Sequence, residues 1–273
     1  MAKLGNLATR VLVAVVAVPL LLLAIYQPHH EVVWGIVFAA SLLTMHEFFT
    51  MTIETPADRT ASLVIGGAAG VAFYWLPARY APFMTPFLAA FLLPALYYLF
   101  RPGEIATVAA RLAFTATGIL YGGLLFTFLA LIKRDLPHGD DYIVLMLATA
   151  WLSDTGGYFA GKYLGKKKLY PLVSPNKTWA GSIGGVAAAV AGGIAMERFR
   201  LQGLTWYDVA LLSGLGSVLG QLGDLIESLV KRSRGVKDSG AILPGHGGLL
   251  DRVDAVLFIA PFFYLYAIMR AAF

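Results

Sequence analysis

The chain is a succession of long apolar runs separated by short polar segments. Nine runs approach the roughly 20 apolar residues that a helix needs to cross the hydrocarbon core of a bilayer. They cover residues 9–26, 32–50, 62–77, 83–100, 106–132, 142–164, 179–196, 207–230 and 253–272. The first run leads almost directly into the second, so we expect a retained span there and not a removable signal peptide.

Composition points to the same class. Of the 273 residues, 58% are hydrophobic and 14% are charged, whereas a soluble domain is about 25% charged. We therefore predict an all-α, multi-pass integral membrane protein with about nine transmembrane helices, forming one polytopic domain over 1–273. The sequence contains no cysteine, which excludes disulfides, thiolate metal sites and cysteine nucleophiles.

Lysine and arginine predict the orientation of the spans. With the N-terminus in the cytoplasm, 14 of the 21 Lys and Arg residues fall on inside segments and 6 on outside segments, with Arg111 inside a span. This bias satisfies the positive-inside rule for an N-in, C-out protein of the inner (cytoplasmic) membrane. The same rule explains the net charge of +5, so we expect no nucleic-acid partner.

Small residues are frequent in two of the runs. Glycines at 66, 67 and 70, and again at 181, 184, 185, 192 and 193, are typical of helices that pack closely in lipid. Polar residues instead gather in the second half of the chain. We expect the spans of 1–141 to pack and face lipid, and the spans of 142–273 to carry the chemistry.

Five carboxylates of the second half lie at membrane depth. Asp154 is near the middle of the sixth run, Asp224 and Glu227 are in the last third of the eighth, and Asp251 and Asp254 open the ninth. Charged groups at this depth mark functional sites by default. The eighth and ninth runs join on the cytoplasmic side, so their carboxylates can converge there.

Carboxylates that converge beside many cations favour a metal–phosphate site. Mg²⁺ prefers a few carboxylates together with phosphate oxygens, and Lys and Arg neutralise the remaining charge. We expect Asp224, Asp251 and Asp254 to hold Mg²⁺. For Glu227 and Lys231, at i and i+4, membership of an ion-pair network that only joins two helices is the stronger alternative.

Two cytoplasmic loops supply further candidates. Ser174 and Lys177 lie in a turn opened by Ser-Pro, where a merely solvated basic turn is the alternative. Gly247 and Gly248 could offer backbone N–H groups to phosphate. His246, between them and Gly245, could bind phosphate, move a proton or only hydrogen-bond an aspartate.

Two further charges lie within the first half. Glu47 in the second run and Arg111 in the fifth could pair with each other or with a lipid phosphate. A purely structural use of both is an equal alternative.

The run from Ser228 to Asp254 resembles the signature of the CDP-diacylglycerol synthases (phosphatidate cytidylyltransferases). The matching residues are Ser228-Leu229-Val230-Lys231-Arg232, Lys237-Asp238, Pro244-Gly245-His246-Gly247-Gly248 and Asp251-Arg252-Val253-Asp254. A second block is similar to the family's other cytoplasmic motif: Asp154-Thr155-Gly156-Gly157-Tyr158-Phe159-Ala160-Gly161 and Ser174-Pro175-Asn176-Lys177-Thr178-Trp179-Ala180-Gly181. The chain departs at Asn176 and Ala180, where family members often have Lys and Glu.

The resemblance implies the reaction CTP + phosphatidate → CDP-diacylglycerol + pyrophosphate, with Mg²⁺ and a homodimer. It places an acidic metal site on Asp224 and Asp251, and we expect Lys177 and His246 to act in catalysis beside them. Substrate contacts are expected from Asp154, Ser174, Asn176, Ser228, Lys231, Arg232, Lys237, Gly247, Gly248 and Arg252.

Two other functions remain open. A CTP-dependent polyprenol or lipid kinase would use similar groups to transfer the γ-phosphoryl group. An ion-coupled transporter would also carry carboxylates near the midplane, but transporters usually show internal repeats in matching halves, and here the polar residues are gathered in one half.

The orientation can be tested with single cysteines in this cysteine-free chain. We predict that a Lys167→Cys variant reacts with an impermeant maleimide from the cytoplasmic side, and that an Arg198→Cys variant reacts from the opposite side. Labelling of position 167 only from the opposite side would overturn the predicted orientation.

Overall fold

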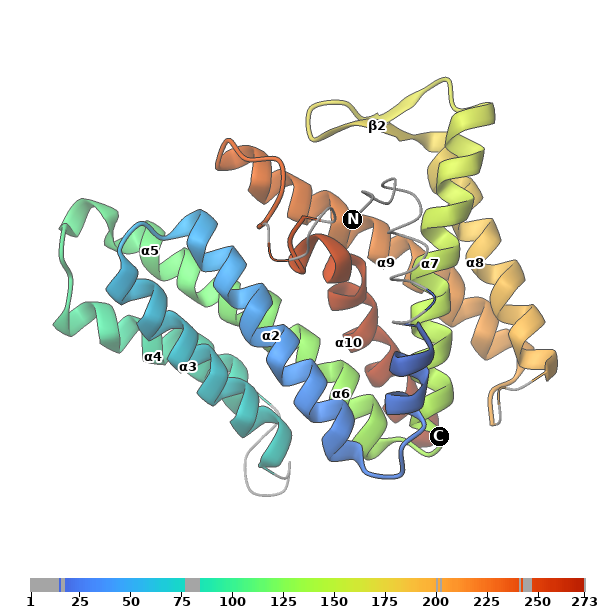
Figure 1. Ribbon diagram of the computed structural model, residues 1–273, viewed down its shortest axis with the longest axis horizontal. Coiled ribbons are helices and arrows are strands. Elements are labelled where there is room, and N and C mark those ends of the chain that lie inside the picture. The colour runs from blue at the N-terminus through green and yellow to red at the C-terminus, as the bar shows by residue number, and fades with distance from the viewer. Residues whose placement is uncertain are drawn as a thin grey trace, which may run out of the picture.

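The computed structural model describes residues 15, 18–76, 84–199, 201, 203–240, 242 and 247–272. The protein is mostly helical. A helical segment over 18–25 comes first. The helices that follow are α2 (His30–Thr52), α3 (Pro56–Trp75), α4 (Thr85–Phe100), α5 (Ile105–Gly118), the π-helix η1 (Ile119–Leu124), α6 (Leu125–Asp135), α7 (Gly139–Leu164), α8 (Trp179–Phe199), α9 (Trp206–Ser233) and α10 (Leu250–Ala272) (Figure 1).

Each predicted run overlaps a helix in the part of the chain that the structure describes. Among the residues that the structure describes, five helical stretches are long and apolar enough to cross a membrane, which supports a multi-pass membrane protein. They are His30–Thr52, Ile105–Asp135, Trp179–Arg198, Trp206–Ser233 and Leu250–Ala271. Helix α4, with 16 residues, is shorter than a span. The count of nine spans and the cytoplasmic N-terminus stay predictions.

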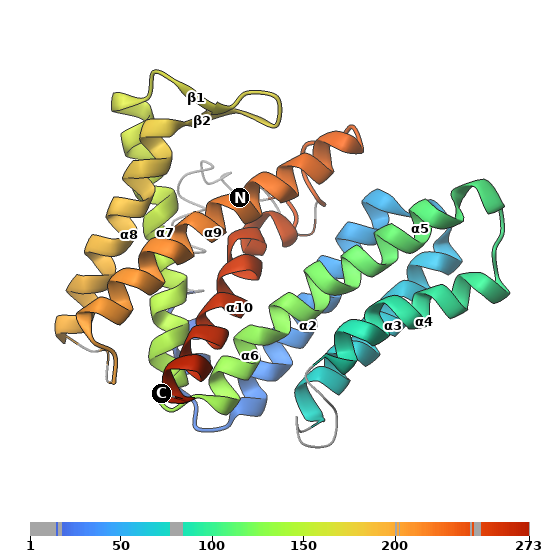
Figure 2. The same cartoon turned by 180° about the vertical axis from the view of Figure 1, so that it is seen from behind.

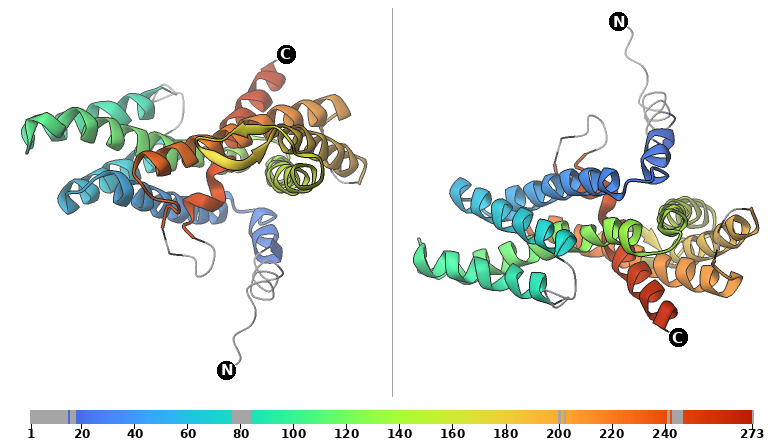
Figure 3. Two further views of the ribbon diagram at one scale, coloured as in Figure 1. Left: turned by 90° about the horizontal axis from the view of Figure 1, so that it is seen from above. Right: turned by 90° about the horizontal axis from the view of Figure 1, so that it is seen from below.

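The helices form two groups with α10 between them. Helices α2 to α6 lie together on one side, and α7, α8 and α9 lie on the other (Figure 1). The views from behind, above and below show the same division (Figures 2 and 3). Helix α10 contacts α6 and α2 of the first group and α9 and α7 of the second. Its buried residues Leu257 and Phe263 belong to the common apolar core with Phe48 of α2.

Glycine lets α7 and α8 touch along their backbones. A Cβ on Gly156 would lie 2.8 Å from the carbonyl oxygen of Gly184, and a Cβ on Gly181 would lie 2.9 Å from that of Gly157. Such separations are too short for any side chain. The predicted packing role of the glycines in the seventh run is therefore confirmed for this interface.

The basic segment between α7 and α8 is a β-hairpin, so the all-α prediction is wrong there. Strands β1 (Lys168–Tyr170) and β2 (Ser174–Thr178) pair antiparallel, with Lys168 opposite Thr178 and Tyr170 opposite Ser174. The hairpin projects beyond the helix ends (Figures 1 and 2). Its second strand leads straight into α8, which begins at Trp179.

The long fifth run contains a π-helical turn. Within η1, the carbonyl oxygen of Gly122 accepts hydrogen bonds from the hydroxyls of Ser41 (3.0 Å) and Thr44 (3.1 Å) of α2. Such a turn leaves backbone groups free for side-chain partners and is frequent at functional sites. It also buries Tyr121, whose ring lies edge-on to Phe258 of α10.

The backbone contact between α7 and α8 can be tested with Gly184→Ala. The added methyl would collide with Ala160, and the variant should lose about 1–3 kcal/mol of stability from overpacking. Gly35→Ala is the matched control, because a Cβ at Gly35 would meet no atom within 4 Å. Thermal unfolding in detergent should separate the two variants, and equal melting temperatures would contradict the interface.

Candidate functional site

Three carboxylates meet where α9 packs on α10. Single oxygens of Asp224, Glu227 and Asp254 all lie within 4.8 Å of one another. Glycines on α9 permit this approach: a Cβ on Gly223 would lie 2.7 Å from the carbonyl oxygen of Asp254. The sequence predicted Asp224 and Asp254 in one site, and the structure brings them together.

Lys177 and Asp154 reach the same place from two other elements. The hairpin carries Lys177 to α9, where its Nζ lies 2.5 Å from Oδ2 of Asp224. Asp154 of α7 interacts electrostatically with Asp224, Lys177 and Arg252. The side chains of Lys177 and Asp224 are 26% and 34% exposed, so a ligand can reach this pair.

Hydrogen bonds between α7, α8 and α9 hold these elements in place. Ser153, which precedes Asp154, shares a hydrogen bond of 2.7 Å with Ser217 of α9. Gln221, one turn before Asp224, accepts a hydrogen bond of 2.5 Å from Ser182 of α8. Polar side chains that face each other between helices in this way fix the relative positions of Asp154 and Asp224.

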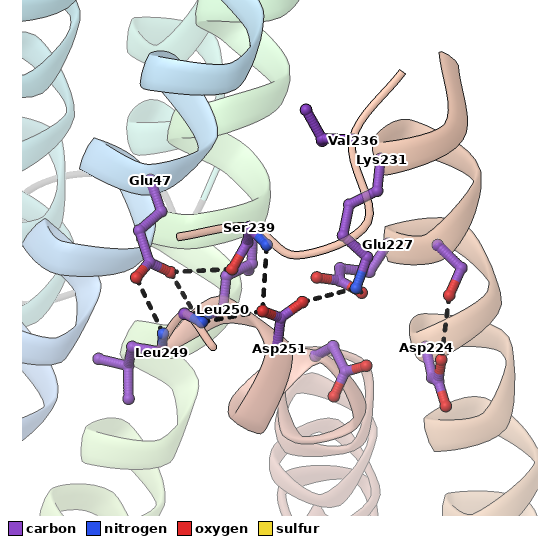
Figure 4. A network of polar contacts seen from close by, with 12 residues as sticks. Glu47, Asp224, Glu227, Lys231, Val236, Ser239, Leu249, Leu250 and Asp251 are labelled. Carbon is purple, nitrogen blue, oxygen red and sulfur yellow. Dashed lines mark hydrogen bonds and ion pairs between the residues drawn. The ribbon is translucent and has the colours of Figure 1, made fainter. Parts of the chain in front are cut away.

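A second group of charges, Glu227, Lys231 and Asp251, lies beside the first and is shielded from solvent. Lys231 is buried, and its ammonium contacts the carboxylate of Glu227 and, at 2.6 Å, Oδ1 of Asp251 (Figure 4). The other oxygen of Asp251 accepts hydrogen bonds from the backbone N–H groups of Ser239 (3.0 Å) and Gly248 (2.9 Å). The i, i+4 ion pair proposed for Glu227 and Lys231 is therefore present within α9, and the contact of Lys231 with Asp251 joins α9 to α10.

This arrangement adds Glu227 to the candidate metal ligands. Asp251 contacts Lys231 and backbone amides, whereas Glu227 contacts Lys231 and also lies with Asp224 and Asp254. One oxygen of Glu227, Oε1, is buried without a hydrogen-bond partner, as is the hydroxyl of Tyr121. A buried carboxylate oxygen without a donor favours a cation as its partner. Asp251 as a metal ligand stays a prediction.

The partners of Glu47 differ from those that the sequence suggested. Its two carboxylate oxygens accept hydrogen bonds from the N–H groups of Leu249 (2.9 Å) and Leu250 (2.8 Å) at the start of α10 (Figure 4). Arg111 instead pairs with Asp58, at 2.8 Å. The idea that Glu47 and Arg111 pair with each other is wrong. Only the membrane depth of Glu47 signalled its importance.

The other predicted site residues divide into four sets. Ser228 donates to Oδ1 of Asp224 at 3.4 Å. Arg232, Lys237, Asn176 and Arg252 are exposed, and Ser174 and Gly247 are half-buried, so each can meet a ligand from outside. The N–H group of Gly248 is already donated to Asp251. His246 lies outside the described residues.

The site is electrostatically unbalanced toward negative charge. Asp154, Asp224 and Asp254 face Lys177 and the exposed Arg252. Carboxylates this close repel one another unless a cation lies among them. Asp224, Asp254 and Glu227 together offer the oxygen ligands that Mg²⁺ prefers. Lys177 and Arg252 could then neutralise phosphate groups bound beside the metal.

Comparisons with known proteins agree with this chemistry. A model described as "Cytidylyltransferase family" matches residues 8–269. The chain is 47% identical over 156 residues to "Phosphatidate cytidylyltransferase" of Brucella suis biovar 1 (strain 1330), which covers 57% of each chain. It is 39% identical over 196 residues to the protein of that name from Bacillus subtilis (strain 168), covering 64% of this chain and 73% of the relative. The chain thus spans somewhat over half the length of the Brucella relative that it matches.

The bridging role of Lys231 can be tested by stability. We predict that Lys231→Met, which leaves Glu227 and Asp251 buried without their cation, destabilises the protein by about 3–5 kcal/mol. Arg232→Met, at the neighbouring exposed position, is the control and should change stability little. Unfolding in detergent measures both variants, and equal losses would show that Lys231 does not compensate the buried carboxylates.

Proposed function

Because the chain belongs to the cytidylyltransferase family, we propose that it transfers the cytidylyl group of CTP to phosphatidate, giving CDP-diacylglycerol and pyrophosphate. The names of the relatives from Brucella and Bacillus support this substrate pair. The observation that carries the proposal is the convergence of Asp154, Lys177, Asp224 and Asp254 from four elements.

The reaction needs charge compensation more than acid–base catalysis. An ionised phosphate oxygen of phosphatidate forms a bond to the α-phosphorus of CTP, and the bond from that phosphorus to the β-phosphate oxygen breaks. No proton has to be removed, because the attacking oxygen is already ionised at neutral pH. Both reactants are strongly anionic, so cations must bring them together.

The residues of the site can be assigned to these tasks. Asp224 and Asp254, with Glu227 as the third carboxylate, would hold Mg²⁺. We keep the prediction that Asp251 is a further metal ligand. Bound Mg²⁺ would neutralise phosphate charge and stabilise the leaving pyrophosphate. Lys177 would exchange part of its contact with Asp224 for a substrate phosphate, and Arg252 would meet the nucleotide or lipid phosphate from the exposed side.

The location of the site fits one lipid and one water-soluble substrate. Asp224 is in the last part of α9, and the hairpin that carries Lys177 projects beyond the helix ends (Figure 1). Phosphatidate could enter from the membrane while CTP enters from water. We place the site at the inner leaflet of the cytoplasmic membrane, and we expect a homodimer, which light scattering of the protein–detergent complex would detect.

Labelled CTP tests the proposed reaction. Purified protein with Mg²⁺, phosphatidate and CTP labelled at the α-phosphate should release pyrophosphate and form a labelled lipid. A lipid labelled only from the γ-phosphate, with a polyprenol-type alcohol as acceptor, would identify a kinase instead. Absence of any transfer under conditions in which a Bacillus relative is active would contradict both reactions.

The role of Lys177 separates substrate binding from a general basic surface. We predict that Lys177→Gln lowers kcat/KM by about 30- to 1,000-fold, because one charge-assisted contact in a partly dry site is lost. Lys167→Gln, in the exposed run that precedes β1, is the matched control and should have little effect. Equal, small effects would exclude the phosphate contact, and equal, large effects would indicate a diffuse field that attracts both anionic substrates.

A further inference from the structure

The N-terminus of α10 already holds an anion, and that anion belongs to the protein. The carboxylate of Glu47 accepts the N–H groups of Leu249 and Leu250 and, at 3.1 Å, the hydroxyl of Ser239. Free N–H groups at a helix start attract negative charge, because no residue of the same helix can accept them. Here a residue of α2, about 200 positions away in the sequence, fills that place.

The glycines of the loop fit around this carboxylate. A Cβ on Gly240 would lie 2.7 Å from Oε1 of Glu47, and a Cβ on Gly248 would lie 2.6 Å from Oε2. Both positions therefore require glycine so that the backbone can close on Glu47. The Gly-rich pattern suggested phosphate binding. At Gly248, however, the backbone lies against the carboxylate of Glu47, and its N–H group donates to Asp251.

The same contacts lead to the acidic site. Ser239 is held twice, with its hydroxyl on Glu47 and its N–H on Asp251. Asp251 and Asp254 follow within the first turns of α10, three residues apart on one face. A helix whose first N–H groups lose their acceptor frays from that end. The position of Asp254 relative to Asp224 thus depends on the cap that Glu47 provides.

We propose that Glu47 is a positioning residue of the acidic site: its buried carboxylate caps α10 from the first half of the chain and so holds Asp251 and Asp254 in place. Glu47 itself need not touch a substrate. The inference deepens the proposed cytidylyl transfer and rests on it for its catalytic consequence, but the cap and its effect on cation binding can be measured without any turnover.

The test compares Glu47→Gln with Asp58→Asn. Both variants convert a buried carboxylate of the first half into an amide, at 3% and 5% exposure, but Asp58 pairs with Arg111, outside the candidate site. Hydrogen exchange is followed by mass spectrometry over 247–256. Binding of Mn²⁺, used as the probe cation, is followed by the loss of its EPR signal. Turnover is measured against Mg²⁺ concentration.

For Glu47→Gln we expect exchange over 248–252 to rise by about 10-fold or more, because a charged acceptor of backbone N–H groups is lost. Mn²⁺ binding should weaken by about 10-fold, and kcat should fall roughly 10- to 100-fold with a higher Mg²⁺ requirement. For Asp58→Asn, any faster exchange should be confined to α3, α4 and α5, with kcat within about two-fold of the parent.

Several outcomes would overturn the proposal. Unchanged hydrogen exchange or unchanged Mn²⁺ binding in Glu47→Gln would each do so, as would equal losses of Mn²⁺ binding and turnover in the two variants. Faster turnover in Glu47→Gln would also do so, because it would show that Glu47 competes with a substrate phosphate. An inactive parent protein with the expected exchange and Mn²⁺ results would reject the cytidylyl transfer and uphold the positioning role. If Glu47→Gln does not fold, Ser239→Ala should raise exchange over 248–252 and weaken Mn²⁺ binding by about 3-fold each, because it removes one hydrogen bond to Glu47. An unaffected Ser239→Ala variant would count against the positioning role.

Discussion

A carboxylate that is buried between helices needs a cation or hydrogen-bond donors, and the site of this protein depends on how that need is met. Asp251 receives Lys231 and two backbone N–H groups. Asp224 receives Lys177, and Glu47 receives the start of α10. The contacts of Asp224 and Glu47 join elements that are distant in the sequence, and the contact of Asp251 with Lys231 joins the consecutive helices α9 and α10. The interactions that offset burial of charge are therefore also those that assemble α2, β2, α9 and α10 around one point.

Close packing of the helices makes these polar contacts possible. The glycines at the α7–α8 and α9–α10 interfaces let backbones approach to distances that any Cβ would prevent. In lipid, where apolar burial gives little drive for helices to associate, such approach supplies much of the packing energy. It also shortens the path between charges, because a side chain as short as Asp254 can then reach across to Asp224. Glycine in these helices thus serves packing and chemistry together.

The sequence was sufficient for the features that depend on local patterns. Apolar runs located the helices, and membrane depth identified Asp154, Asp224 and Asp254. The i, i+4 spacing identified the pair of Glu227 and Lys231. Pairing across the chain could not be read in this way: Glu47 meets the start of α10 only because α2 and α10 pack together. The hairpin was also missed, since two strands of three and five residues flanked by lysines carry too little periodicity. Among the described residues, length and hydropathy support five spans, so the count of nine stays a prediction.

The two charge groups at the end of α9 differ in a way that bears on catalysis. Around Lys231, the ammonium contacts the carboxylates of Glu227 and Asp251 in a buried group, which suits a rigid support. Around Asp224, three aspartates face Lys177 and Arg252, and the pair of Asp224 and Lys177 is partly exposed. Surplus negative charge that lies only where water and ligands can enter would direct a metal ion to that side. Preorganised charge is effective when its supports do not move. The buried group around Lys231, together with Glu47, would then hold Asp224 and Asp254 in place while anionic substrates bind and leave.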